Sequence, residues 1–269
     1  YLHRAEILIE AKPIAVGVRL EHPQSLIDEI RYHSPEGRGK YLPAAEYVYK
    51  AQAEGRGVYS FCMCPGGFVV PASTGPEETV VNGMSPANRG SRWANSGLVV
   101  ELHPEDIPAT GIRVEDPASP LALMQWCEAF EHKSYLAANR SLRAPAQRMT
   151  DFVARRHSST LPSSSYTMGL TSSDLHEWMP DFITRRLSAG FRAFDRTTRG
   201  FLTGEAQLIG VESRTSSPVR IPRDRMTYAH PVVAGLYPAG EGAGFAGGIV
   251  SAAIDGENAA QQIALALGR

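Results

Sequence analysis

The glycine-rich run GEGAGFAGG, residues 240–248, carries the most specific chemical pattern in the chain. Gly242, Gly244 and Gly247 match the spacing G-x-G-x-x-G, which in a strand-to-helix turn brings backbone amides close to the phosphates of a dinucleotide. Because glycine has no Cβ, a ligand can approach this backbone, and the N-terminus of a following helix favours an anion or an electron-rich carbonyl. The alternative is a glycine-rich turn that only packs tightly.

The same run lacks the rest of a dinucleotide-binding unit. Such a unit needs a second parallel strand and usually an acidic residue about 20 positions further on, whereas this chain ends as a helix at about that distance. We expect residues 231–240 to form a last short strand, followed by a helix with a small inner face that permits close packing. That face consists of Ile249, Ala253, Gly256, Ala260, Ile263 and Leu267.

Cysteines occur as a closely spaced pair before a Pro-Gly-Gly turn, with a third further on. On a regular strand Cys62 and Cys64 would share one face, where a direct disulfide between them would be strained. They are either small buried side chains beside a tight turn or thiols with a catalytic or substrate-contacting role. Together with Cys127 they form no paired C-x-x-C set and have no histidine cluster, so the sequence predicts no metal site.

Polar side chains with a possible substrate-binding role are concentrated in residues 82–100, where they alternate with turn-forming residues. They could orient a polar substrate, or they could be ordinary turn formers. A later arginine could neutralise a carboxylate or phosphate, although lone surface arginines are commoner than anion clamps. The candidate substrate-binding residues are Asn82, Arg89, Asn95 and Arg214.

Several classes of function are excluded by what the sequence lacks. His176 and Glu177 begin an H-E-x-x-H pattern, but Pro180 stands where the second histidine is required. The chain has no G-x-S-x-G elbow, and no G-K-[ST] follows the glycines, which excludes serine hydrolases and nucleoside triphosphatases of those types. With 27 basic and 28 acidic residues, the formal net charge of −1 gives no case for nucleic acid or an anionic membrane as partner.

Hydropathy is consistent with a small-molecule partner and a cytoplasmic location. No apolar run approaches the roughly 20 residues that span a bilayer, and the first ten residues lack the apolar segment of a signal peptide. The three cysteines form no even disulfide framework, as is common in a reducing compartment.

The elements that must position these residues follow from periodicity and turn signals in the first half of the chain. Residues 12–20 are predicted to form a strand, and a short helix is predicted to follow it. Pro23 suits the first turn of that helix. Four β-rich runs within residues 57–102, separated by Gly, Pro, Asn and Ser, predict successive antiparallel strands.

The second half is predicted to be largely helical before strand-like alternation returns at residues 206–221. Residues 119–157 indicate a helical region with a break near Pro145, and a second helical stretch from Asp174 restarts or kinks at Pro180. The Ser/Thr-rich residues 158–173 are either a surface connection or a loop that contacts substrate.

Seven sequence blocks along nearly the whole chain carry a family resemblance: KPIAVGVRLEHPQ, YSFCMCPGGFVVPAS, VVNGMS, ANSGLVVEL, SSYTMGL, RTSSPVRI and GLYPAGEGAGFAGGIVSAAIDG. Their content and order resemble the C-terminal portion of a family of uncharacterised bacterial FAD-dependent dehydrogenases, within the two-dinucleotide-fold oxidoreductases. Members of that family carry the glycine fingerprint for the ADP half of FAD well before the segment at which this chain begins.

The resemblance implies an α+β fold in three parts. Residues 1–12 would be a residual first segment of the FAD domain. Residues 13–228 would form an inserted substrate domain with a mixed or antiparallel sheet and a helical part at about 119–200. Residues 229–269 would be the last strand and helix of a split FAD-binding α/β domain.

The resemblance also implies the chemistry, a hydride transfer between FAD and an unknown substrate. Gly240 and Glu241 would meet the ribityl and pyrophosphate region, and amides near Gly247 would face the pyrimidine edge of the isoalloxazine. The ADP-binding half would come from the N-terminal FAD domain of the same protein. The implied cofactor-binding residues are Gly240, Glu241, Gly242, Ala246, Gly247, Gly248 and Ile249.

Because the ADP-binding half is absent from these residues, we expect the chain alone to be inactive and to hold no stoichiometric FAD. Apolar surface that the other half would cover could then drive a homodimer. The alternative is a non-catalytic ligand-binding or assembly module that retains the fold.

Overall fold

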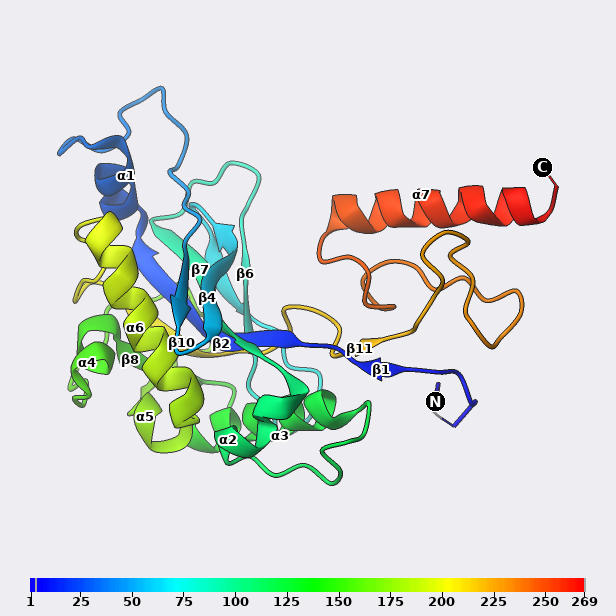
Figure 1. The fold of residues 1–269 in the computed structure, drawn as a ribbon. Coiled ribbons are helices and arrows are strands. Elements are labelled where there is room, and N and C mark those ends of the chain that lie inside the picture. Colours follow the sequence, from blue (N-terminus) through cyan, green and yellow to red (C-terminus); the bar gives the residue numbers. More distant parts are fainter. Residues whose placement is uncertain (3, 269) are drawn as a thin grey trace.

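A seven-stranded mixed sheet forms the centre of the fold in the computed structural model, which describes residues 1–2 and 4–268 (Figure 1). Neighbouring strands pair antiparallel except for the parallel pair at one edge, β8 with β9. Helices are interspersed with the strands, so the α+β class is confirmed. The strands in spatial order are β3 (Lys50–Ala53), β4 (Arg56–Cys64), β7 (Trp93–Leu102), β2 (Ile14–Pro23), β10 (Gln207–Glu212), β8 (Ala144–Arg148) and β9 (Leu170–Ser172).

Two small sheets and the helices complete the fold. Hairpin β5/β6 pairs Phe68–Pro71 with Val81–Met84, and β1 (Glu10–Ala11) pairs with β11 (Val219–Arg220). None of the helices in the described residues is both long and apolar enough to cross a bilayer. The helices are α1 (Gln24–Tyr32), η1 (Pro104–Asp106), α2 (Ile107–Thr110), α3 (Ala122–Ala137), α4 (Met149–Ala154), α5 (Leu175–Trp178), α6 (Asp181–Thr197) and α7 (Ile249–Ala266).

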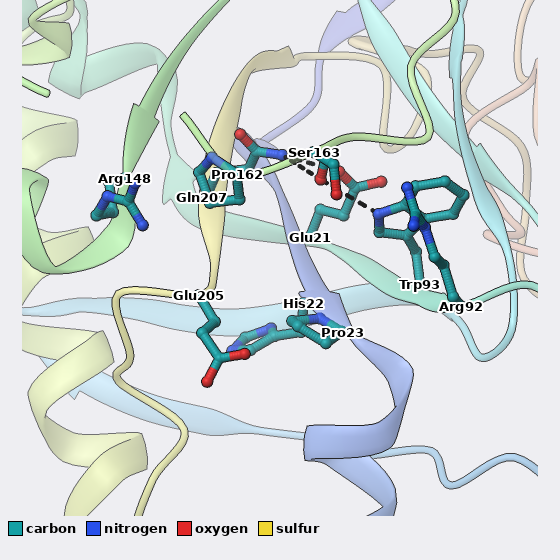
Figure 2. Close-up of a pocket in the computed structure, with 10 residues that line it drawn as sticks. All are labelled: Glu21, His22, Pro23, Arg92, Trp93, Arg148, Pro162, Ser163, Glu205 and Gln207. Carbon is teal, nitrogen blue, oxygen red and sulfur yellow. Dashed lines mark hydrogen bonds between the residues drawn. The ribbon is translucent and has the colours of Figure 1, made fainter. Parts of the chain in front are cut away.

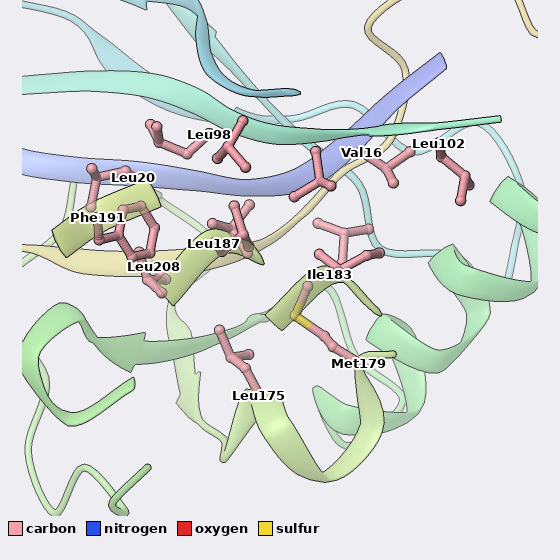
Figure 3. Packing of buried hydrophobic residues seen from close by; sticks show 14 of the residues in the cluster. Val16, Leu20, Leu98, Leu102, Leu175, Met179, Ile183, Leu187, Phe191 and Leu208 are labelled. Atoms are coloured by element: carbon pink, nitrogen blue, oxygen red, sulfur yellow. The ribbon is translucent and has the colours of Figure 1, made fainter. Parts of the chain in front are cut away.

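The central strand β2 is buried on both faces, and its side chains divide the sheet into an apolar and a polar face. Val16, Val18 and Leu20 point to one face, since side chains alternate along a strand. There they pack with Leu187 and Phe191 of α6 in the main hydrophobic cluster (Figure 3). This apolar face therefore holds the sheet and its covering helix together.

The opposite face of β2 carries Arg19 and Glu21, both buried. It is covered by β5/β6 and by the Ser/Thr-rich segment, through a small cluster that includes Val69, Val81 and Tyr166. Burial of two charged side chains requires hydrogen-bond partners, which Arg19 finds on strands of the sheet and Glu21 on β10 and the Ser/Thr-rich segment. The polar face is therefore where chemistry-bearing residues collect.

Most elements predicted from the sequence are confirmed. Residues 14–32 form β2 and α1, with Pro23 at the helix N-cap. The four runs within 57–102 are β4 to β7, all paired antiparallel, and the run 206–221 contains β10 and β11. Pro180 separates α5 from α6, as its missing N–H requires.

Pro145 does not break a helix, because residues around it form strand β8. The antiparallel pairs of β8 with β10 run from Arg148 to Ala146, so position 145 lies beyond the last pair. A proline is tolerated there, since no ladder hydrogen bond to β10 is required of it. The predicted helical region therefore contributes strands to the sheet as well as helices.

Residues 158–173 are not simply a surface connection. Ser158, Ser165 and Tyr166 are buried, and the amide of Ser165 donates to Glu21 Oε1 at 3.0 Å. The segment also supplies β9 to the sheet. Its serines are therefore polar partners for the polar face.

The predicted strand at 231–240 is absent from the structure. Its backbone closes turns instead, with the amide of His230 donating to Leu236 O at 2.8 Å and that of Leu236 to Val233 O. A strand needs a neighbouring strand to accept its hydrogen bonds, and none lies beside this segment in the described residues.

One buried histidine makes the stability of this fold pH-dependent. His22 faces Phe201 O at 2.9 Å through Nε2, and burial lowers its pKa from 6.5 to about 4. The folded state thus takes up this proton less readily than the unfolded state. The contribution of His22 to stability is complete above pH 6.5 and is lost as the pH falls to about 4.

We expect His22→Gln to flatten the acid side of the stability curve. The wild-type free energy of unfolding should fall by about 3 kcal/mol from this residue across that window, which the variant should not show. Urea unfolding at a series of pH values measures this free energy for the wild type and the variant. His132→Gln, at a half-exposed position, should keep the wild-type slope, and equal slopes for all three proteins would refute the assignment.

Candidate functional site

The glycine-rich run lies in a loop that joins β11 to α7, on the side of the molecule away from α6 (Figure 1). An ion pair fastens this loop to the helix. Arg223 contacts both carboxylate oxygens of Asp255, at 3.0 and 2.5 Å, and the amide of Gly240 donates to Asp255 at 2.8 Å. Hydrogen bonding from Arg223 lowers the pKa of Asp255, which stays ionised. The start of the run is thereby fixed against α7.

Gly244 has a packing role in the loop. Its φ of +85° lies in the left-handed region, and a Cβ there would meet Val219 O at 2.8 Å. The ring of Phe245 next to it lies 3.8 Å from the guanidinium of Arg223. For this glycine, the interpretation as a tight turn is sufficient.

Other glycines of the run are open. A Cβ on Gly240, Gly242 or Gly247 would meet no atom within 4 Å. Within the described part of the chain, the amides of Ala246, Gly247, Ile249 and Val250 donate to no acceptor. Unpaired amides at the start of a helix attract an anion or a carbonyl oxygen, so this backbone is suited to bind one.

Helix α7 presents its predicted inner face to solvent. Ile249 is 92% exposed, and Ala253, Ala260 and Leu267 are exposed as well, while Gly256 and Ile263 are partly buried. The helix contacts its own chain through another face, which carries Asp255 and the buried Ala259. The close packing predicted for the small face therefore does not occur within these residues, because no sheet lies there.

Two cavities border the glycine run. One, of about 300 Å³, lies between Gly247, Lys12 and the half-buried aromatic side chains Tyr59 and Phe61 of β4. The other, of about 390 Å³, has Glu241 and Arg214 in its walls. The structure thus brings two predicted cofactor residues, Gly247 and Glu241, to the walls of open cavities beside the sheet.

Among the four substrate candidates, Arg214 lines the cavity with Glu241, but its charge is already paired. It contacts Glu131 at 2.7 Å and Glu78 at 3.0 Å, and the hydrogen bonds to Glu131 raise its pKa. With Glu128 also in the wall, this cavity is acidic overall. Arg214 therefore acts on the cavity as part of an ion-pair cluster.

The remaining three candidates have structural partners. Asn82 accepts a bond from the Gly83 amide within β6, and the exposed Arg89 lies 3.9 Å from Glu46. Asn95 is fully buried and accepts from Arg19 Nε at 2.9 Å. The structure does not bring these three together at the glycine run.

The two cysteines do not share a face, contrary to the regular-strand expectation. The pairing of β4 with β7 is irregular between Phe61 and Cys64, and Cys62 has a φ of +44°. This bulge leaves Cys62 exposed and Cys64 buried. Although Cys62 is exposed, desolvation by the surrounding chain raises the pKa of its thiol, which disfavours the reactive thiolate.

The bulge is fixed by Arg19, which sequence reasoning missed. Arg19 is fully buried and donates to Cys62 O at 2.7 Å, and its Nη1 pairs with Glu212 Oε2 at 3.0 Å. A Cβ on Gly83 would lie 1.9 Å from Arg19 Nη2, so only glycine fits over the guanidinium. An isolated Arg and Glu on strands far apart in sequence give no local signal of this pairing.

Comparison with known proteins identifies the family to which this chain belongs. Residues 13–215 match the family described as FAD-dependent protein, C-terminal domain-like. The chain is also 41% identical over 266 residues to an uncharacterized protein of Clostridium beijerinckii, covering 97% of this chain and 48% of that protein. This chain belongs to the FAD-dependent protein C-terminal family, and it spans about half the length of the curated relative it matches.

Removal of Arg19 should leave Glu212 as an uncompensated buried carboxylate. We expect Arg19→Met to lower the free energy of unfolding by about 3–5 kcal/mol near neutral pH, and Arg19→Met/Glu212→Gln to lower it by less. Arg196→Met, an exposed change on α6, is the matched control.

The pH dependence of that loss has a defined sign. Burial raises the pKa of Glu212 above 4.5 and Arg19 opposes this, so the variant raises the folded-state pKa further. The free energy of unfolding of the variant then falls as the pH rises past 4.5. The decrease caused by Arg19→Met should therefore be larger at about pH 8 than at about pH 5. A loss that is the same at both pH values, in urea unfolding, would contradict the pairing.

Proposed function

We propose that this chain is the substrate-binding and C-terminal flavin-contacting part of an FAD-dependent oxidoreductase that transfers hydride between an unidentified substrate and FAD. The observation that carries the proposal is the open backbone at Gly240, Gly242 and Gly247 beside unpaired amides at the start of α7. The family match over residues 13–215 supports the choice of FAD as the ligand.

The amides of Ala246, Gly247 and Ile249 would donate to a carbonyl at the pyrimidine edge of the flavin. FAD, when bound, supplies the hydride-transfer chemistry. Negative charge develops at that edge on reduction, and aligned amides with a helix dipole stabilise such charge. Gly240 and Glu241 would contact the ribityl and pyrophosphate region. The contribution of this chain is thus orientation and electrostatics.

Substrate would enter the cavity of about 300 Å³ beside Gly247. Tyr59 and Phe61 give that cavity an aromatic wall, and Lys12 adds a cation whose Nζ donates to Ser216 Oγ at 3.1 Å. Burial lowers the pKa of Lys12. Glu101 in the same wall offsets the charge of Lys12, so a planar or apolar substrate without a strong net charge fits these walls best.

The missing half of the flavin site would be the N-terminal FAD domain of the same protein. Exposed apolar side chains on α7, such as Ile249, Val250 and Ile254, form a surface that this domain would cover. The relative from Clostridium beijerinckii has about as much sequence again outside the matched part, which is room for such a domain. In its absence the same surface could support a homodimer.

FAD titration, followed by visible absorbance, tests the split site. We expect no stoichiometric FAD on this chain and binding by a protein extended upstream to include the other half. If neither protein binds FAD, the flavin proposal fails and a non-catalytic ligand-binding module becomes the better description.

A substitution in the loop tests which backbone contacts the flavin. Gly247→Val should weaken FAD binding by the extended protein by about tenfold or more, because its side chain would occupy the open space at the amides. It should leave thermal stability of the chain nearly unchanged, since no atom lies near the new Cβ. Ala118→Val adds bulk on an exposed loop and should leave FAD binding unchanged. If Gly247→Val and Ala118→Val bind FAD with equal affinity, Gly247 does not contact the flavin.

A further inference from the structure

Lys12 lies between β1 and β2, where the small sheet β1/β11 leads from the central sheet toward the part of the fold that carries α7 (Figure 1). Its amide donates to Pro218 O at 2.9 Å. Its Nζ donates to Ser216 Oγ at 3.1 Å and to Ser217 O at 3.5 Å. The ammonium is therefore held at a defined place in the wall of the cavity beside Gly247.

The ammonium of Lys12 is a half-buried cation without a carboxylate in contact. Within the described residues no Asp or Glu lies in ion-pair range of its Nζ, whereas Arg223 on the same side of the molecule is paired with Asp255. A half-buried charge without a counter-charge is costly. An anion close to Nζ would therefore be stabilised by it.

More distant charges do not remove this excess. Burial and the positive charge of Arg220 lower the pKa of Lys12, and the negative charge of Glu241 opposes them only in part. Glu101 lines another part of the same cavity, where its carboxylate accepts from the Gly57 amide at 3.0 Å. The charged form of Lys12 is thus less stable in the folded protein than in water.

The charged side chains around the cavity at the other end of β2 are bonded within the chain (Figure 2). There Glu21 accepts from Gln207 Nε2 at 3.1 Å, and Arg148 pairs with Asp151 at 3.8 Å. Lys12 differs, because one of the three N–H donors of an ammonium group is left over after its two serine contacts. The cavity beside the glycine run is therefore the better place for an anion.

The glycine run contributes a second kind of partner for an anion in this cavity. Gly247 lines it together with Lys12, and the Gly247 amide has no acceptor in the described part of the chain. A Cβ on Gly247 would meet no atom within 4 Å, so the backbone is open there. An ammonium group and amides at the start of a helix both favour negative charge.

The proposed function supplies an anion that is present in only one of two states. Under it, these amides lie at the pyrimidine edge of FAD, which is neutral in the oxidised form. Transfer of a hydride from substrate brings two electrons and one proton, so one negative charge is gained. An interaction shifts an equilibrium only by its difference between the two states, and a nearby cation favours the state that carries the charge.

We propose, on the basis of the proposed function, that the ammonium of Lys12 stabilises the negative charge which reduction places at the pyrimidine edge of FAD, and so raises the reduction potential of the bound cofactor. Lys12 adds a full positive charge to the partial charges of the amides. It acts on the equilibrium between oxidised and reduced FAD rather than on the attachment of FAD to the protein. The site thus accepts hydride from weaker donors than the amides alone would allow.

Potentiometry of the FAD-loaded protein, extended upstream to include the other half of the flavin site, tests this proposal. Lys12→Met removes the charge and keeps the approximate length of the side chain. We expect it to shift the reduction equilibrium about tenfold toward oxidised FAD, which is about 30 mV for a two-electron couple. Lys12→Arg keeps the charge and should stay within about twofold of the wild-type equilibrium.

Titration with oxidised and with reduced FAD separates this role from a structural one. Lys12→Met should bind reduced FAD about tenfold more weakly and oxidised FAD within about twofold of the wild type, because the two affinities and the potential are linked. A variant that only disturbs the loop would lose both affinities equally and keep its potential. Lys133→Met, at an exposed position on α3, is the matched control and should change neither.

An unchanged potential in Lys12→Met, or equal losses of affinity for the two forms of FAD, would overturn this inference. The proposed function would still stand in that case, as long as the wild-type extended protein binds FAD. If that protein binds no FAD, the proposed function fails and this inference fails with it. If Lys12→Met does not fold, Lys12→Gln decides, since glutamine is neutral and can still donate to Ser216 Oγ.

Discussion

The buried guanidinium of Arg19 links three strands of the central sheet to β2. It lies on β2 and binds Asn95 of β7, Glu212 of β10 and the carbonyl of Cys62 on β4. A guanidinium without water must satisfy its donors within the protein. Strands β7, β10 and β4 therefore have to present acceptors at one level of the sheet, which favours the observed register of β7 and β10 on β2.

Local irregularities of the sheet follow from that requirement. The bulge at Cys62 turns its carbonyl toward Arg19 and leaves its side chain exposed. Gly83 on the covering hairpin has no side chain because the guanidinium occupies that space. The apolar face of β2 provides most of the burial, and the polar face gives the sheet a specific arrangement. Both the burial and the specific arrangement come from the alternation of side chains along β2.

Sequence patterns predicted the elements whose formation depends on local periodicity and punctuation. Strand β2, the restart of the helix at Pro180 and the helix after the glycine run all have such signals, and all are present. The strand character of Pro145 and the bulge at Cys62 depend on partners distant in sequence, which no local pattern reports. The apolar run at 231–240 has strand composition, but composition does not supply a neighbouring strand.

The candidate site was predictable to a similar extent. The spacing of glycines located the loop, but the pattern could not distinguish Gly244, which packs on Val219, from Gly247, which is open. That difference depends on the path of β11, which the spacing does not encode. Arg214 was found as a cation near the loop, whereas its pairing with Glu131 needed the fold.

The N-terminal turn of α7 carries two kinds of group without a partner: backbone amides and apolar side chains. In the described part of the chain the amides of Ile249 and Val250 have no acceptor, and the side chains of these two residues are exposed to solvent. A small anion alone would satisfy the amides and leave the apolar side chains in water. A protein surface alone would bury the side chains and leave the amides unpaired, which is costly. Under the proposed function, the arriving domain and its flavin together satisfy both, so docking of that domain and binding of FAD should stabilise one another.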